Sequence, residues 1–144
     1  MSTISTVEKV IAENGYIVHS ISGVSMMPLL RQNQDAVHIV PNTERLKRDD
    51  IVLYKRRDGS LVLHRVVRVK GSEYIIRGDN CINNERVLES QIIGVAQGIY
   101  RDGQYYSCDD ETILKYASRQ RMTLPYRRLR AFLGRAKRRL MHGK

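Results

Sequence analysis

The spacing of hydrophobic residues predicts a short helix near the start of the chain. Apolar side chains recur at helical intervals within residues 7–11. Ser5 and Glu8 have the spacing of a capping box, in which each side chain accepts a hydrogen bond from a backbone N–H at the helix start. The dipeptide NG that follows is a typical C-terminal stop. We therefore expect a helix over about residues 6–14.

From Tyr16 to about Tyr106 the pattern changes to short β-branched and aromatic runs. In chain order these are YIVHSI, DAVHIV, DIVLYKR, LVLHRVVRV, EYIIRG, QIIGVAQGIY and QYYSCD. Turn-forming residues lie between several of them, at positions 41–42, 57–60, 70–72 and 101–103. Many short strands at such spacing favour a mainly β fold, either a mostly antiparallel sheet or a small barrel.

Helical spacing returns after Cys108. Asp109 can cap a helix, and the acidic residues after it favour the positive end of the helix dipole. A second helical segment is expected near Pro125, which suits the first turn of a helix, and residues 122–124 are the expected hinge. Its apolar positions are Leu129, Phe132, Leu133, Ala136 and Leu140. The pattern divides the chain into a main domain, residues 1–108, and a helical tail, residues 109–144.

The net charge of +10 comes entirely from the end of the chain. Residues 1–118 hold all 15 acidic residues and 15 of the 25 basic residues, so this part is neutral. The other ten lysines and arginines lie between Arg119 and Lys144, where there is no acidic residue. Such asymmetry is informative about partners rather than about fold.

Three interpretations of the basic amphipathic tail remain open. Its apolar stripe packs on the main domain, or the tail lies on an anionic membrane surface, or it binds nucleic acid. We expect no specific nucleic acid, because no reading motif or base-stacking aromatic set accompanies the charge. The sequence does not indicate the oligomeric state.

The residues that commonly bind metals are not arranged as a site. Cys81 and Cys108 have neither CxxC spacing nor an accompanying histidine pair, and His19, His38 and His142 lack ligand spacing. We expect two ordinary thiols, no metal and no cofactor.

The N-terminus lacks the features of a secretory signal, and no apolar run approaches the roughly 20 residues of a membrane span. These patterns predict a cytoplasmic protein, at most peripheral at a membrane.

The segment ISGVSMMPLL contains a serine that the backbone can expose on a turn. Gly23 allows close backbone approach to a ligand, and Pro28 fixes the chain direction after Ser25. A serine hydroxyl becomes a nucleophile only with a base in hydrogen-bond reach and donors for the oxyanion. Met26 and Met27 are expected to line the core or a pocket.

His64 and Asp79 are the candidate partners of Ser25. In an alternating strand His64 shares a face with Val62 and Val66, where burial would lower its pKa and keep it a neutral base. Asp79, in the turn cluster RGDN, could fix the imidazole tautomer as the third member of a triad. Each also has a plain structural interpretation, as a sheet-face histidine and as a turn aspartate.

Taken in order, GVSMMP, QDAVHIV, LKRDDIVLYKR, LHRVV, RGDN and QIIGVAQG resemble the signal peptidase I family, within the wider group of serine proteases that includes the self-cleaving SOS repressors. The resemblance covers roughly residues 21–97 and implies a signal-peptidase-like β domain with Ser25 as nucleophile. The histidine at position 64 resembles the branch of the family that pairs serine with histidine. Asp79 matches an aspartate that supports either the histidine or the nearby fold.

The activity that this resemblance implies is that of a serine endopeptidase cleaving a leader, signal or precursor peptide. His64 would take the proton of Ser25, and an acyl-enzyme would form and be hydrolysed. The substrate would bind extended, as an added strand. The Ser25 backbone N–H and, second, Ser22 would bind the oxyanion. Gly23, Met26 and Met27 are further candidates for contact with the substrate.

Two departures from the family pattern keep an alternative open. The two Gly-Asp pairs of the family read Gln34-Asp35 and Asp49-Asp50 in this chain. Without those glycines, the same fold could be a catalytically inactive module that binds a peptide or another partner. A regulatory fragment akin to the self-cleaving repressors is disfavoured, because no helix-turn-helix reader precedes the core.

Overall fold

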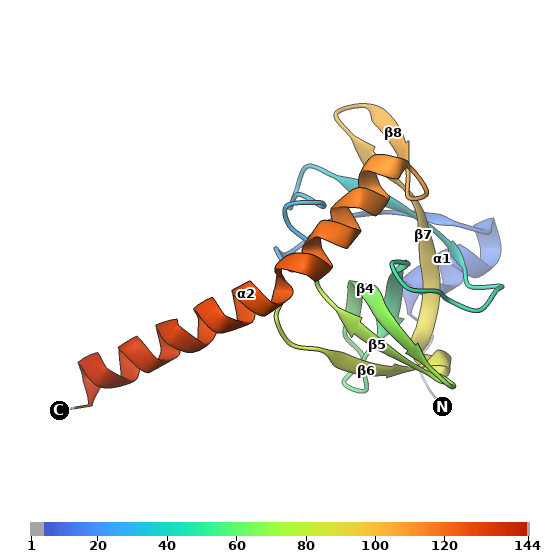
Figure 1. The fold of residues 1–144 in the computed structure, drawn as a ribbon. Coiled ribbons are helices and arrows are strands. Elements are labelled where there is room, and N and C mark those ends of the chain that lie inside the picture. Colours follow the sequence, from blue (N-terminus) through green and yellow to red (C-terminus); the bar gives the residue numbers. More distant parts are fainter. Residues whose placement is uncertain (1–4, 144) are drawn as a thin grey trace.

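The computed structural model describes residues 5–143 and begins with the predicted helix (Figure 1). Helix α1 is Thr6–Asn14, and its capping box is formed: the Glu8 N–H donates to Ser5 Oγ, and the Ser5 N–H donates to the Glu8 carboxylate. Gly15 ends the helix at φ 80°, in the left-handed region that favours glycine. The prediction for residues 6–14 is confirmed.

Eight strands form one antiparallel sheet that curls into a half-barrel (Figure 1). They are β1 Ile17–Ser20, β2 Ala36–Pro41, β3 Ile51–Lys55, β4 Leu61–Lys70, β5 Glu73–Arg77, β6 Glu85–Leu88, β7 Ile92–Arg101 and β8 Gln104–Ser107, with a 3-10 turn, η1 Glu89–Gln91, before β7. The strand order is β1-β2-β7-β3-β4-β5-β6, and β8 pairs with β7. The mainly β prediction is confirmed, and each predicted run contains a strand. Only the short β6 was not predicted.

Two clusters of buried side chains fill the curl of the sheet. One lies between α1, β2, β7 and the start of α2, and it includes Leu30, Ile39 and Ile113. The other lies between β3, β4 and β5 and includes Tyr54 and Tyr74. The first cluster also holds Met26, Leu29 and Leu30 from the loop after β1. The loop that carries Ser25 is therefore packed into the core.

The C-terminal segment is a single helix, α2, Glu111–His142, and not the two helices expected with a hinge at residues 122–124. Pro125 lies inside it, and Figure 1 shows α2 changing direction along its length. The Gln120 carbonyl accepts hydrogen bonds from Thr123 Oγ1 and from Arg127 Nη2, at 3.2 and 3.4 Å. Side chains thus supply polar contacts next to the proline, which bends the helix without ending it.

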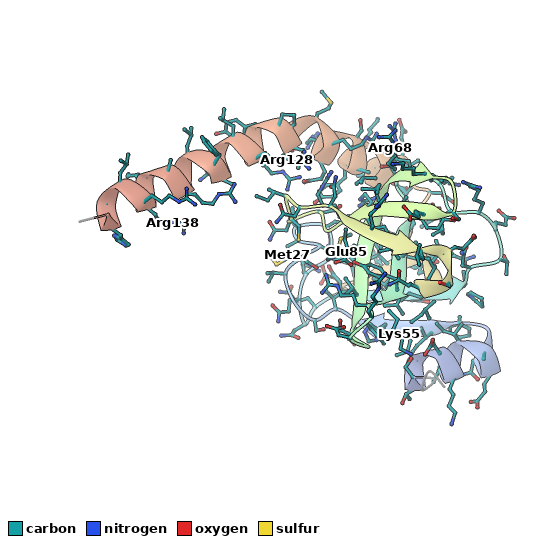
Figure 2. The ribbon with its side chains drawn as sticks, turned by 90° about the horizontal axis from the view of Figure 1, so that it is seen from below. Met27, Lys55, Arg68, Glu85, Arg128 and Arg138 are labelled. Atoms are coloured by element: carbon teal, nitrogen blue, oxygen red, sulfur yellow. The ribbon has the colours of Figure 1, made fainter. Side chains whose placement is uncertain are left out.

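The first half of α2 packs on the sheet, and the second half extends beyond it. Ile113 and Ala117 are buried, and Arg121 forms an ion pair with Asp49. Figure 2 shows Arg128 beside the sheet and Arg138 on the projecting part. The start of the predicted tail therefore shares the core of the main domain. Over residues 5–143, no helix combines the length and the apolar character needed to cross a membrane.

Candidate active site

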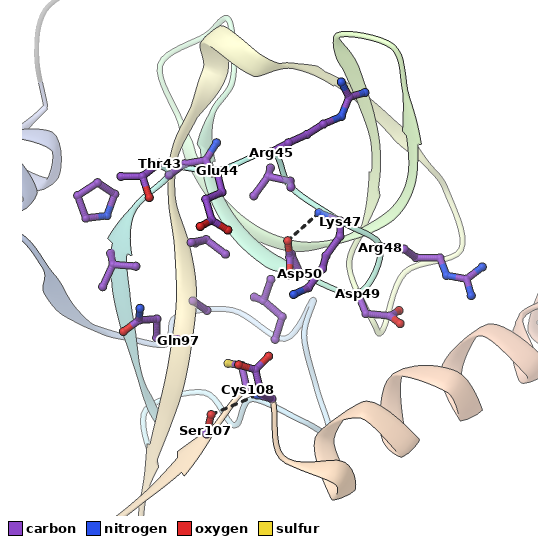
Figure 3. Close-up of a pocket in the computed structure, with 18 of the residues that line it drawn as sticks. Thr43, Glu44, Arg45, Lys47, Arg48, Asp49, Asp50, Gln97, Ser107 and Cys108 are labelled. Carbon is purple, nitrogen blue, oxygen red and sulfur yellow. Dashed lines mark hydrogen bonds between the residues drawn. The ribbon is translucent and has the colours of Figure 1, made fainter.

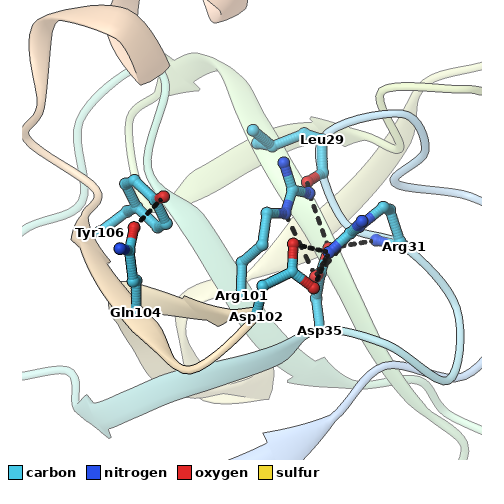
Figure 4. Close-up of polar contacts among 7 residues, drawn as sticks. All are labelled: Leu29, Arg31, Asp35, Arg101, Asp102, Gln104 and Tyr106. Atoms are coloured by element: carbon cyan, nitrogen blue, oxygen red, sulfur yellow. Dashed lines mark hydrogen bonds and ion pairs between the residues drawn. The ribbon is translucent and has the colours of Figure 1, made fainter.

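The loop over residues 21–35 is fastened to the end of β7 by a buried carboxylate. Asp35 accepts hydrogen bonds from Arg31 Nη2 at 2.9 Å and from Arg101 Nη2 at 2.7 Å (Figure 4). Burial alone would raise the pKa of Asp35, but the hydrogen bonds and charges of the two arginines outweigh it and lower that pKa. Arg101 also donates to the Leu29 carbonyl. This clamp fixes the loop that carries Ser25.

Ser25 and His64 line one cavity of about 350 Å³. Ser25 is half-buried in a turn, and His64, on β4, is 8% exposed. Among the other lining residues are Ser22, Gly23, Met26, Arg56, Leu61, Val62, Leu63 and Cys81, whereas Met27 does not line the cavity. Gly23 has φ 82°, so the backbone at this position favours glycine over a residue with a side-chain donor.

Gly78 lies next to both the Ser25 segment and His64. A Cβ atom on Gly78 would lie 2.7 Å from the Ser25 carbonyl oxygen and 3.0 Å from His64 Nε2. The Asn80 N–H donates to the same Ser25 carbonyl at 2.8 Å, and Asn80 Nδ2 donates to the Val24 carbonyl at 3.0 Å. The absence of a side chain at residue 78 thus lets the base and the serine turn approach each other.

The tautomer of His64 follows from its contact with Tyr54. Tyr54 Oη donates its proton to Glu85 Oε2 at 2.5 Å and lies 3.3 Å from His64 Nδ1. A hydroxyl group has one proton to donate, so in this arrangement the proton of the second contact belongs to Nδ1. His64 Nε2 is then unprotonated and is the ring nitrogen nearest Gly78. Tyr54 and Glu85 are the site residues that the sequence interpretation missed.

The environment of His64 favours its neutral form. Burial lowers the pKa of His64 below its ordinary value of 6.5; the charge of Arg56 also lowers it, and the charges of Glu85 and Asp79 oppose the shift. This confirms the predicted direction of the shift. Between the described residues there is no hydrogen bond from Ser25 Oγ to His64. Catalytic hydrogen bonds are often long in an enzyme without substrate and tighten when it binds.

Asp79 makes no hydrogen bond to His64 but pairs with the neighbouring residue Arg65. Arg65 Nε and Nη2 donate to the two oxygens of the Asp79 carboxylate, both at 2.8 Å, and both side chains are buried. The Asp79 N–H donates to Met26 Sδ at 3.4 Å. The expectation that Asp79 fixes the histidine is therefore replaced by the other role that the resemblance implies, support of the nearby fold.

The cavity borders a strand edge that is free on one side. β4 pairs with β3 over residues 61–65, whereas its pairing with β5 begins at Arg65, opposite Arg77. Among the described strands, none pairs with the second side of residues 61–64, which also line the cavity. An extended peptide could bind there by strand addition, continuing the line of β5 past Ser25.

A larger cavity, of about 470 Å³, lies away from this site (Figure 3). The loop of residues 42–50 and the turn around Cys108 line it, and neither Ser25 nor His64 does. Burial raises the pKa of Asp50 and raises that of Cys108 to about 11, so the thiol stays protonated at neutral pH. Cys81 and Cys108 are both free thiols. This cavity therefore offers no activated nucleophile.

No family model and no curated protein sequence matches this chain. Within residues 5–143, no group of three histidine, cysteine, aspartate or glutamate side chains is placed to hold a metal ion.

Proposed function

We propose that this chain is a serine endopeptidase with Ser25 as nucleophile and His64 as general base. The observation that carries the proposal is the shared cavity: a half-buried serine and a histidine held in its neutral form line one space beside a free strand edge. An extended peptide is the ligand that such an edge fits. A leader, signal or precursor peptide is the substrate class that the family resemblance implies.

In the proposed reaction, His64 Nε2 takes the proton of Ser25 Oγ as the oxygen attacks the peptide carbonyl. The resulting imidazolium gives this proton to the leaving amine, and an acyl-enzyme remains. His64 then activates a water molecule, which releases the acyl group and restores Ser25. Each step moves one proton through Nε2, the nitrogen that the Tyr54 contact leaves free.

Tyr54 and Glu85 act in this scheme as positioning residues. The Glu85 carboxylate accepts the Tyr54 proton, and Tyr54 Oη accepts from His64 Nδ1. The developing imidazolium is thereby oriented by a hydrogen-bond chain that ends in a negative charge. Glu85 is itself held by Arg56, whose Nε donates to Oε1 at 3.0 Å. The Ser25 backbone N–H, which donates to no other described residue, is the first candidate for the oxyanion.

A fluorophosphonate probe tests the nucleophile directly. We expect covalent labelling at Ser25, abolished in Ser25→Ala and slowed at least about 100-fold in His64→Ala, the lower end of what a general base contributes. Ser60→Ala, at an exposed serine outside the cavity, is the matched control and should label at the normal rate. Labelling that persists in Ser25→Ala would sink the proposal.

The same experiment separates the peptidase from the inactive binding module. The absence of a Ser25–His64 hydrogen bond is the feature that favours the module. If the probe leaves Ser25 unlabelled while the protein binds extended peptides, and a Leu63→Pro variant weakens that binding, the module is the better description. The Val66 N–H donates to the Asp50 carbonyl on the β3 side, so by alternation the Leu63 N–H faces the free edge of β4, where proline would remove a backbone donor.

A further inference from the structure

The outer half of α2 has an apolar stripe that the described part of the chain leaves uncovered. Six side chains recur at alternating intervals of four and three residues and therefore lie along one side of the helix. This outer stripe consists of Met122, Tyr126, Leu129, Leu133, Ala136 and Leu140. The five large side chains are between 55% and 84% exposed. Exposed apolar surface of this extent is typical of an interaction site.

The sheet lies on the other side of α2. Arg127 Nη1 donates to the Asp79 carbonyl at 2.7 Å, and Arg128 Nε donates to the Ile82 carbonyl at 3.1 Å. Each residue turns an α-helix by about 100°, so these two arginines point at least about 120° away from the centre of the outer stripe. Figure 2 shows Arg128 on the side of the sheet. The outer stripe therefore faces away from the main domain.

Basic residues surround the outer stripe. There is no Asp or Glu between Thr112 and Lys144, and Arg130, Lys137 and Arg139 border the stripe. If a second copy of α2 packed on the stripe as in a coiled coil, these like charges would meet across the interface. Self-pairing is therefore unfavourable, and a partner with negative charge is favoured.

We propose that the outer half of α2 binds the surface of an anionic lipid bilayer. The outer stripe would enter the interface, and the flanking lysine and arginine side chains would extend to the level of the phosphates. Each basic residue near such a surface adds to the attraction. Nucleic acid would match the charge but leave the apolar stripe exposed, and a second copy would match the stripe but not the charge. The inference does not depend on the activity of Ser25.

Sedimentation with vesicles tests this binding. The full chain should pellet with vesicles of phosphatidylserine and phosphatidylcholine, and much less with phosphatidylcholine alone. Added salt should weaken the binding because it screens charge. Replacing Lys137 and Arg139, which border the stripe, with glutamine should weaken it roughly fivefold for each charge removed. Arg86→Gln, at an exposed arginine on β6, is the matched control and should bind like the unmodified chain.

A substitution within the outer stripe tests how much the apolar side chains contribute to vesicle binding. Leu133→Glu places a negative charge in the outer stripe and should reduce vesicle binding at least about tenfold. The substitution removes an apolar side chain that would be buried in the lipid, and the anionic surface repels the new carboxylate. Leu114→Glu makes the same substitution at a half-exposed leucine near the start of α2, outside the stripe, and should have little effect. Leu133 is 57% exposed, so the thermal unfolding midpoint should stay unchanged and separate lost binding from lost folding.

Tryptophan fluorescence reports whether the stripe enters lipid, because the chain has no tryptophan of its own. A tryptophan at Phe132, beside the stripe, should shift its emission to the blue and be quenched by brominated lipid, whereas one at Arg138 should not. Three results would overturn the inference: equal binding to neutral vesicles, binding to duplex DNA that is tighter than to anionic vesicles and insensitive to Leu133→Glu, or a dimer in sedimentation that Leu133→Glu dissociates.

Discussion

His64 and Arg65 are neighbours on β4, and each is buried, yet their surroundings differ. His64 has one weak contact, 3.3 Å from Tyr54 Oη, and burial keeps its pKa low. Arg65 keeps its charge, because both oxygens of Asp79 accept from its guanidinium at 2.8 Å. On one face of β4, His64 can gain or lose a proton. On the other face, the charge of Arg65 is balanced by that of Asp79.

The difference shows how a single strand can supply both chemistry and support. A buried charge costs several kcal/mol unless it is paired, so Arg65 and Asp79 depend on each other. The pair holds the turn after β5, where Gly78 and Asn80 contact the Ser25 segment. His64 needs no partner of opposite charge while it is neutral, and in the proposed reaction this leaves it free to take up a proton.

The largest expected effect comes from breaking the Arg65–Asp79 pair. Arg65→Met would leave Asp79 buried without a counter-charge and should lower the free energy of unfolding by about 3–5 kcal/mol. The double variant Arg65→Met, Asp79→Leu should recover most of this loss, because no unpaired charge remains. Urea unfolding of the three proteins measures both effects.

An exposed ion pair is the control for that comparison. Arg86 Nη2 lies 3.1 Å from Glu73 Oε2 at the sheet surface, where water screens the charges. Arg86→Met should cost between about 0 and 1 kcal/mol. If Arg65→Met costs no more than Arg86→Met, Arg65 and Asp79 do not depend on each other for stability.

The sequence predicted most of the elements, because their signals are local. The capping box at Ser5 and Glu8 and the alternating runs of β4 and β7 are properties of adjacent residues. Helix α2 was predicted in two parts because Pro125 suits the first turn of a new helix, and packing of Ile113 and Ala117 on the sheet was not visible in the sequence.

The partners of His64 could not be predicted from local pattern, since they depend on strand register. Val52 pairs with His64 and Tyr54 with Val62, which places Tyr54 diagonally opposite His64 on one face. The turn at residues 57–60 offered the signal for this hairpin, and working out its register would have brought Tyr54 next to His64. Glu85 lies on β6, the strand that no pattern predicted.

A smaller effect is expected from removing the hydroxyl group of Tyr54. Tyr54→Phe keeps the buried ring but leaves His64 Nδ1 without its acceptor, a loss of about 1 kcal/mol or roughly fivefold in rate. The labelling rate of Ser25 should fall by this factor at neutral pH. Tyr74→Phe is the matched control: Tyr74 is equally buried, its hydroxyl contacts Glu89 at 3.5 Å, and labelling should be unchanged. Equal rates in the two variants would remove Tyr54 from the site.

The smallest effect concerns pH. His64 reacts as a base only when neutral, so the labelling rate should rise with pH around a midpoint below 6.5, the ordinary pKa of histidine. The charge of Glu85 raises the pKa of His64 and that of Arg56 lowers it. Glu85→Gln should therefore move the midpoint down and Arg56→Gln should move it up, each by about half a pH unit or threefold in rate on the acid limb. The two opposite shifts distinguish an electrostatic effect on His64 from a loss of folding, which would lower the rate at every pH. Shifts in the same direction for both variants would mean that Glu85 and Arg56 do not act on His64 through their charges.

The stability of the protein should depend on pH in the same direction as the labelling rate. The unfolded chain binds the His64 proton more tightly than the folded chain, because burial lowers the pKa of His64 in the folded state. The free energy of unfolding should therefore fall as the pH drops below about 6.5.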